Sequence, residues 1–185
     1  MTDIAEIITL LQSGKTMLYP TDTVWGLGCD AMNEAAVKKI FEIKERSETK
    51  SLIILVDSLE MLQTFVPHLG GKLSRLHEFH ARPLTVIYPN PSLPTHLKAE
   101  DGSVAIRIVK DVFCQALIQG LGRPIVSTSA NISGAPTPRF FNEISAELRQ
   151  KVDYITTYRQ KDRTETAPST IIRLDEKDEI VVIRA

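Results

Sequence analysis

The sequence lacks the features that mark several specialised classes of protein. Its 185 residues include only two cysteines, Cys29 and Cys114, which have no paired spacing and lie in apolar stretches. We therefore expect both to be reduced core residues rather than a disulfide or metal ligands. No apolar run approaches the roughly 20 residues of a membrane-spanning helix. Acidic residues interrupt the first apolar segment, so no signal peptide is predicted. We expect a cytoplasmic protein without membrane association.

The sequence also lacks an excess of basic or of acidic residues. Lysine and arginine together number 22 against 23 aspartates and glutamates, which gives a net charge of -1. A globally basic nucleic-acid binder is therefore disfavoured, although a local basic patch stays open. A hydrophobic content of 43% over this length is enough for one well-buried domain and short of two. We expect a single domain over residues 1–185.

The common catalytic motifs are missing or incomplete. Residues 13–16 read Ser-Gly-Lys-Thr, but a phosphate-binding loop needs a glycine five residues before Gly14, where the sequence has Thr9. Neither G-x-G-x-x-G nor G-x-S-x-G occurs, which disfavours dinucleotide-binding and hydrolase folds. None of the four histidines has the spacing of a zinc protease, so no metal site is expected.

Hydrophobic patterning predicts helices and strands in irregular alternation. Helices are expected near residues 4–11, 36–43 (capped by Asn33), 73–80, 111–117 (ending near Gly120) and 142–149, with a short one opened by a capping box at 57–60. Strands are expected at residues 16–19, 52–56, 84–88, 104–108, 154–157, 170–174 and 180–183, and just before residue 127. Strands adjoin near the middle and the C-terminus, which predicts an α/β fold with a mixed sheet and packed helices.

Two polar stretches directly follow short apolar runs. Residues 19–28 read Tyr-Pro-Thr-Asp-Thr-Val-Trp-Gly-Leu-Gly, and residues 127–134 read Ser-Thr-Ser-Ala-Asn-Ile-Ser-Gly. We predict each as a loop at the end of a buried strand, facing the other across one cleft. The first is either a turn in which Asp22 bonds its own backbone, or a ligand-facing loop with Thr23 and an apolar wall at Trp25. The second suits an anion or nucleotide site, or is an unliganded polar loop.

Basic residues elsewhere in the sequence are further candidates for a binding site. Lys44, Arg46 and Lys50 lie within seven residues at the end of a predicted helix. They are either favourable charges at a helix C-terminus or a site for a polyphosphate. Arg107 lies inside the apolar strand predicted at 104–108, where it either pairs with a carboxylate or awaits an anionic ligand.

Taken in order, these stretches resemble the YrdC-like family of threonylcarbamoyl-AMP synthases. The resemblance rests on residues 19–28, 44–46, 50, 82–85, 104–107, 129–134 and 168–170, and spans about residues 17–184. It implies a twisted α/β domain with a large concave cleft, in a short single-domain form. It also implies a nucleotidyltransferase that converts L-threonine, bicarbonate and ATP into threonylcarbamoyl-AMP and pyrophosphate. A downstream threonylcarbamoyl-transfer enzyme then modifies an adenosine beside the tRNA anticodon.

The resemblance also assigns roles to individual residues. The threonine site would contain Thr23, Arg107, Ser127 and Ser169. The ATP site would contain Arg46, Lys50, Ser103, Ser129, Thr137 and Arg184, while Lys44 and Asn131 line the same cleft. No residue is assigned as a general acid or base, and Mg²⁺ is expected with ATP, held mainly by the nucleotide and water.

Two other functions stay open at this point. One is a non-catalytic RNA-binding module of the same fold, and weak binding of tRNA or double-stranded RNA is expected even of the enzyme. The other is a paralogue that keeps the nucleotide site but takes a different amine or acyl partner.

Overall fold

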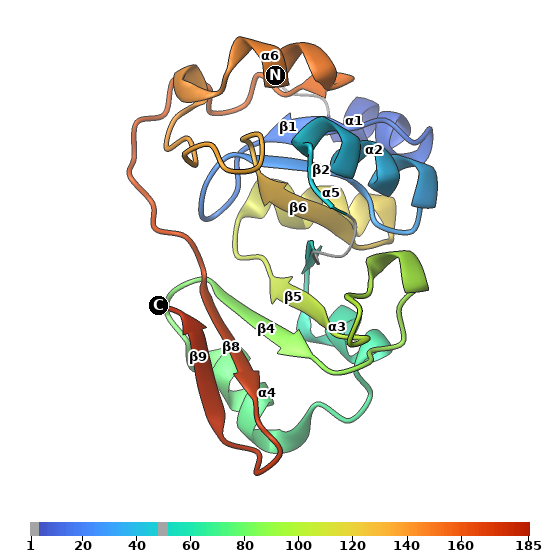
Figure 1. The fold of residues 1–185 in the computed structure, drawn as a ribbon, viewed down its shortest axis with the longest axis vertical. Coiled ribbons are helices and arrows are strands. Elements are labelled where there is room, and N and C mark those ends of the chain that lie inside the picture. The colour runs from blue at the N-terminus through green and yellow to red at the C-terminus, as the bar shows by residue number, and fades with distance from the viewer. Residues whose placement is uncertain (1–3, 48–51) are drawn as a thin grey trace.

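One mixed sheet organises the computed structural model, which describes residues 4–47 and 52–185 (Figure 1). Among these residues the strand order is β7-β1-β2-β6-β3-β5-β4-β8-β9. The strands are β1 (Met17–Tyr19), β2 (Gly26–Asp30), β3 (Ile53–Val56), β4 (Leu84–Tyr88), β5 (Val104–Ile108), β6 (Ile125–Ser129), β7 (Tyr154–Ile155), β8 (Thr170–Leu174) and β9 (Ile180–Arg184). The pairs β1–β7, β3–β5 and β4–β8 are parallel, and the other neighbours are antiparallel. The predicted mixed sheet is confirmed.

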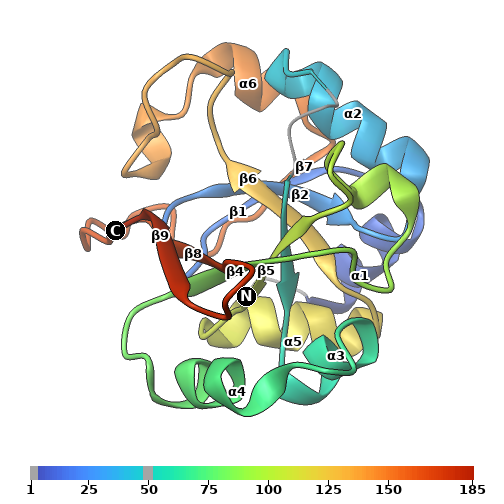
Figure 2. The ribbon, with the colours of Figure 1, turned by 60° about the horizontal axis from the view of Figure 1, so that its bottom comes forward.

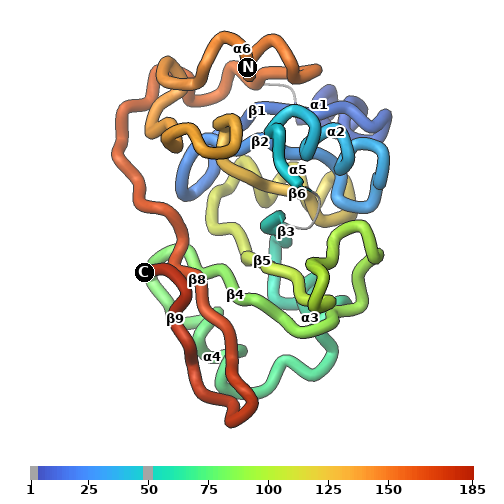
Figure 3. Tube along the Cα trace, viewed as in Figure 1, coloured from blue at the N-terminus to red at the C-terminus, as the bar shows by residue number. Residues whose placement is uncertain are grey.

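Helices cover the sheet from both sides. They are α1 (Ile4–Gln12), α2 (Glu34–Lys44), α3 (Leu59–Phe65), α4 (Gly70–Phe79), α5 (Val112–Leu121) and α6 (Ala146–Lys151), with 3₁₀ turns at Thr95–Leu97 and Phe141–Glu143. Figure 2 shows α2 and α6 on one side of the sheet and α5 on the other. The extended segment between β7 and β8 runs down the outside of the molecule (Figure 3). None of the helices in the described residues is long and apolar enough to cross a membrane.

Strand β3 illustrates how the core is divided. Its residues are apolar without interruption, and successive side chains of a strand point to opposite faces. Ile54 and Val56 pack in a cluster with helix α2, while Leu55 packs in a second cluster with α1 and α5. A strand buried on both faces has this continuous apolar pattern.

Local signals account for most helix ends, with two corrections. Asn33 caps α2 as predicted, since its side chain accepts from the Ala36 N–H at 3.1 Å. The capping box predicted at residues 57–60 is wrong in register, because Ser58 is the N-cap and accepts from the Met61 N–H. Helix α5 ends at Leu121, near Gly120 as predicted, and its C-cap is Gly122, whose positive φ of 67° suits glycine. The helix predicted at 142–149 is instead a 3₁₀ turn followed by the short α6.

The largest correction concerns the two polar stretches. Both were predicted as loops, but Gly26–Asp30 forms strand β2 and strand β6 continues through Ser129. Because glycine is depleted in strands, the two glycines of this segment did not indicate a strand in the sequence. In the fold Gly28 is opposite Ser127, and a Cβ added there would lie 2.2 Å from the Val126 carbonyl oxygen. The glycine therefore permits close approach of two strand backbones.

Candidate functional site

A cavity of about 330 Å³ lies over the middle of the sheet. It is bounded by the segment before β2, the ends of β6 and β9, and the chain leading into β8. Most of the residues that the resemblance assigned to a site line it: Thr23, Arg46, Arg107, Ser127, Ser129, Thr137, Ser169 and Arg184. Both polar stretches contribute lining residues, but they do so from the paired neighbouring strands β2 and β6 and the segment before β2, not as loops that face each other across the cavity.

Strand register brings the lining residues to one face. Ser127 is opposite Ile53, Ile53 is opposite Ala105, and Ala105 is opposite Ile87. Arg107 is two residues beyond Ala105 and therefore shares its face. The cavity consequently has an apolar floor formed by Ile53, Ile87 and Ala105, with Ser127 and Arg107 beside it.

Arg107 is almost completely buried, with 4% of its side chain exposed. Its Nη2 lies 3.2 Å from Asp22 Oδ1, and its Nη1 donates to Thr23 Oγ1 at 3.2 Å. Of the two alternatives left open for this arginine, the structure shows the carboxylate partner, and the same residue also lines the cavity. Asp22 Oδ2 also accepts from the Lys110 N–H at 3.0 Å. The side chain that bonds its own turn is Thr21, whose Oγ1 accepts from the Thr23 N–H.

Arg184 reaches the cavity from strand β9. Its Nη2 donates to the Ser169 carbonyl oxygen at 2.8 Å and to Ser169 Oγ at 3.2 Å. Ser169 Oγ is also 2.8 Å from Thr85 Oγ1. Burial and the nearby charge of Arg107 lower the pKa of Arg184, and burial lowers the pKa of Arg46. Three arginines thus surround one cavity, which favours an anionic ligand.

Lys44 lies behind the cavity and supports the loop after β6. Its side chain is buried, and Nζ donates to the Ser129 and Asn131 carbonyl oxygens, each at 2.7 Å. The third acceptor near Nζ is Asn131 Oδ1 at 3.4 Å. Burial, and then the charge of Arg46, lowers the pKa of Lys44 to about 8. Asn131 Nδ2 donates to the Ala135 carbonyl oxygen at 2.6 Å. The residues around the cavity do not include Lys44 and Asn131, contrary to expectation, because both are engaged in holding the loop.

Two other residues predicted for the ATP site are Ser103 and Lys50. Ser103 precedes β5, donates its N–H to Asp101 Oδ1 at 2.9 Å, and does not line the cavity. Lys50 lies outside the described residues. Within residues 4–47 and 52–185 no cluster of three or more histidines, cysteines or acidic residues could hold a metal ion.

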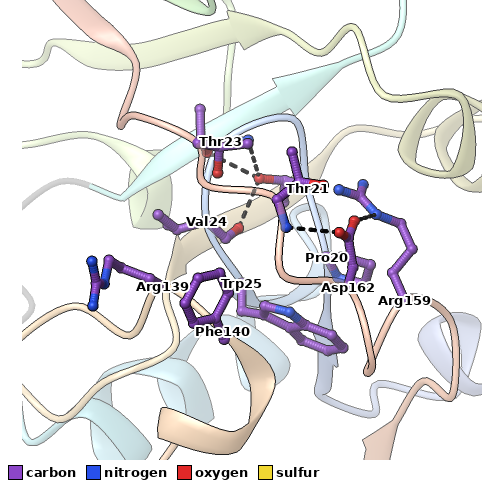
Figure 4. Close-up of a pocket in the computed structure, with 11 residues that line it drawn as sticks. Pro20, Thr21, Thr23, Val24, Trp25, Arg139, Phe140, Arg159 and Asp162 are labelled. Carbon is purple, nitrogen blue, oxygen red and sulfur yellow. Dashed lines mark hydrogen bonds and ion pairs between the residues drawn. The ribbon is translucent and has the colours of Figure 1, made fainter.

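A second, much smaller cavity adjoins the first and shares Thr21, Thr23 and Val24 with it (Figure 4). Its lining includes Phe140 and an ion pair between Arg159 Nε and Asp162 Oδ2 at 2.9 Å. The sequence did not assign Thr21 to a site, although it lines both cavities. The sequence feature that could have identified Thr21 is its position between Pro20 and Asp22 in the first polar stretch.

Comparison with known proteins gives consistent matches. Residues 9–185 match the family model Sua5_yciO_yrdC, described as "Telomere recombination". The chain is 34% identical over 149 residues to proteins named threonylcarbamoyl-AMP synthase from Escherichia coli O1:K1 and Shigella boydii serotype 18. Each match covers 78% of this chain and 78% of the relative.

Two solved structures with the same fold are a Sua5 protein and a YciO protein. P. abyssi Sua5 complexed with L-threonine has a TM-score of 0.82 and 30% identity, over 98% of this chain and 53% of that one. The chain described here therefore spans about half the length of that Sua5. E. coli YciO has a TM-score of 0.82 and 25% identity, over 98% of this chain and 87% of that one.

Proposed function

The chain belongs to the Sua5/YciO/YrdC family, and we propose that it is an L-threonylcarbamoyladenylate synthase. The reaction joins L-threonine, bicarbonate and ATP into threonylcarbamoyl-AMP and releases pyrophosphate. The observation that carries this proposal is the convergence of Arg46, Arg107 and Arg184 with several hydroxyl groups on one cavity. Relatives named for this reaction, and a Sua5 that binds L-threonine, support the choice of substrates.

The threonine would bind on the side of the cavity where Arg107 is buried. Its carboxylate is a suitable partner for the guanidinium, since charge-assisted pairs of this kind are among the strongest hydrogen bonds in proteins. Thr23, Ser127 and Ser169 would contact the amine and the hydroxyl group. Because Arg107 is already held by Asp22 and Thr23, it needs little reorganisation to receive the ligand.

ATP would occupy the side of the cavity nearest Arg46 and Arg184. These two cations oppose the charge of the phosphates, while Ser129 and Thr137 offer hydroxyl groups. We retain Lys50 and Ser103 in the proposed ATP site on the strength of the family motif. Among the described residues that line the cavity there is no carboxylate. An Mg²⁺ ion would therefore arrive on the nucleotide, coordinated by phosphate oxygens and water.

The proposed mechanism works by positioning. The threonine amine takes up CO₂ from bicarbonate as a carbamate, and a carbamate oxygen attacks the α-phosphate of ATP with loss of pyrophosphate. Both reactants are anions, so the fixed arginines offset their repulsion as they approach. Holding reactants in contact can lower a barrier by about 7–11 kcal/mol. Exclusion of water also protects the carbamate from hydrolysis. No protein side chain is assigned as the acid or base.

The product is an activated acyl group that a second enzyme must consume. We propose that a threonylcarbamoyl-transfer enzyme in the cytoplasm moves this group to an adenosine beside the anticodon of tRNA. Any contact of the present chain with tRNA would then be weak, in keeping with a net charge of -1.

Pyrophosphate release from purified protein tests the proposal. Release should require ATP, bicarbonate and L-threonine together, and Arg107→Ala should abolish it by removing the proposed partner of the threonine carboxylate. The control is Arg173→Ala, which removes an exposed arginine of β8 outside the cavity and should retain the wild-type rate. Steeply salt-dependent RNA binding without threonine-dependent turnover would favour the RNA-binding module instead. Turnover with another amine would favour the paralogue.

A further inference from the structure

A short chain of hydrogen bonds links two threonines at the edge of the cavity (Figure 4). Thr21 Oγ1 is 2.8 Å from the Val24 carbonyl oxygen and 2.9 Å from Thr23 Oγ1. It also accepts from the Thr23 N–H at 3.0 Å. Both side chains are buried, at 3% and 5% exposure, so little solvent competes for these bonds.

Counting protons fixes the direction of every bond in this chain. A hydroxyl group has one proton to donate and two lone pairs that accept. The Val24 carbonyl oxygen can only accept, so Thr21 donates its one proton there. Thr21 cannot also donate to Thr23, and the hydroxyl of Thr23 must therefore donate to Thr21. With the Thr23 N–H as a second donor, both lone pairs of Thr21 are occupied.

Toward the cavity, the Thr23 hydroxyl can act only as a hydrogen-bond acceptor. Its own proton is directed at Thr21, and one of its lone pairs accepts from Arg107 Nη1 at 3.2 Å. The second lone pair remains, and Thr23 lines the cavity. A ligand beside Thr23 must therefore offer a hydrogen-bond donor, while the adjacent guanidinium favours a negative charge.

We propose that Thr21 is a positioning residue that makes the Thr23 hydroxyl an obligate acceptor. The site would thereby select a ligand that carries an N–H donor next to a carboxylate. This inference rests on the proposed function, in which the ligand is L-threonine. Its ammonium group supplies the donor, and the nitrogen of its carbamate still carries one N–H. Thr23 can thus accept from the same nitrogen before and after the carbamate forms.

The test measures selectivity rather than affinity alone. Isothermal titration compares L-threonine with 3-hydroxy-2-oxobutanoate, in which a carbonyl acceptor replaces the ammonium group. Thr21→Val frees the Thr23 hydroxyl to rotate and donate, so the preference for L-threonine should fall about tenfold relative to wild type. Thr21→Ser keeps the hydroxyl group and should restore the wild-type preference. A merely structural role for Thr21 would weaken both ligands equally and leave the ratio unchanged.

A second variant keeps the inference testable should Thr21→Val not fold. Thr23→Val removes the acceptor itself, so affinity for L-threonine should fall about tenfold while that for the keto analogue does not fall. An unchanged ratio in Thr21→Val, or equal losses for both ligands in Thr23→Val, overturns the inference and leaves the proposed function standing. A wild-type chain that binds ATP but no L-threonine overturns the proposed function, and the inference with it.

Discussion

Replacing Lys44 by methionine tests whether this lysine holds the loop after β6. The substitution keeps an unbranched side chain that is one atom shorter, and it removes the donor of two 2.7 Å hydrogen bonds to the Ser129 and Asn131 carbonyl oxygens. A buried acceptor left without a partner costs about 1–3 kcal/mol. Both residues are only half-buried, so water replaces part of what is lost. We expect the free energy of unfolding to fall by about 2–4 kcal/mol in total, which a typical domain of about 5–15 kcal/mol survives.

The pH dependence of this difference adds a second readout. The pKa of Lys44 is lowered from 10.5 to about 8, by burial first and then by the charge of Arg46. Between these two pH values the unfolded chain binds more protons than the folded protein. The contribution of Lys44 to stability therefore rises with pH in this window. The gap in free energy of unfolding between wild type and Lys44→Met should widen from about pH 8 to pH 10.

Urea unfolding followed by the fluorescence of Trp25 measures both effects. The matched control is Lys38→Met on the same helix, where an exposed pair with Glu34 is worth at most about 1 kcal/mol. A Lys44→Met variant no less stable than the Lys38→Met control would refute the reasoning. So would a gap that narrows above pH 8.

Three further substitutions probe other parts of the fold. Gly28→Ala places a Cβ 2.2 Å from the Val126 carbonyl oxygen and should lower the free energy of unfolding, measured in urea, by about 1–3 kcal/mol. A variant as stable as wild type would show that β2 and β6 can move apart to admit the methyl group at no cost. Burial raises the pKa of Asp153, but hydrogen bonds, first from Lys39, lower it more, to about 2. Its stabilising effect should therefore disappear as the pH falls from about 4 to 2. In acid titrations by circular dichroism, Asp153→Asn should converge with wild type near pH 2, and a constant gap contradicts this. Ser58→Ala removes a helix cap and should cost about 1 kcal/mol, while Ser58→Asp should not.

The sequence was most informative where local chemistry decides the structure. The strands predicted at residues 84–88, 104–108 and 170–174 have these bounds in the structure, because each is an apolar run rich in β-branched residues. The residues of the cavity came from a family resemblance, carried over position by position. Alternation along β5 then explains why Arg107 shares a face with Ala105.

What could not be predicted depends on contacts between distant segments. Strand β2 looked like a loop, because the need for Gly28 appears only when Val126 lies against it. Nothing near Lys44 in the sequence indicates that its ammonium group would bond residues of the loop after β6. The partner of Asp22 is likewise Arg107, 85 residues away by the numbering of the chain. Such partners are set by the sheet order, which local patterns do not determine.

The central claim is that one cavity joins threonine, bicarbonate and ATP. Mass spectrometry of a reaction with carbon-13 bicarbonate, L-threonine and ATP tests it most directly. The account predicts threonylcarbamoyl-AMP in which carbon-13 replaces carbon-12 at the carbamoyl position, formed in equal amount to pyrophosphate. Pyrophosphate release with an unlabelled adenylate, or no adenylate at all from protein that binds both ATP and L-threonine, would contradict it.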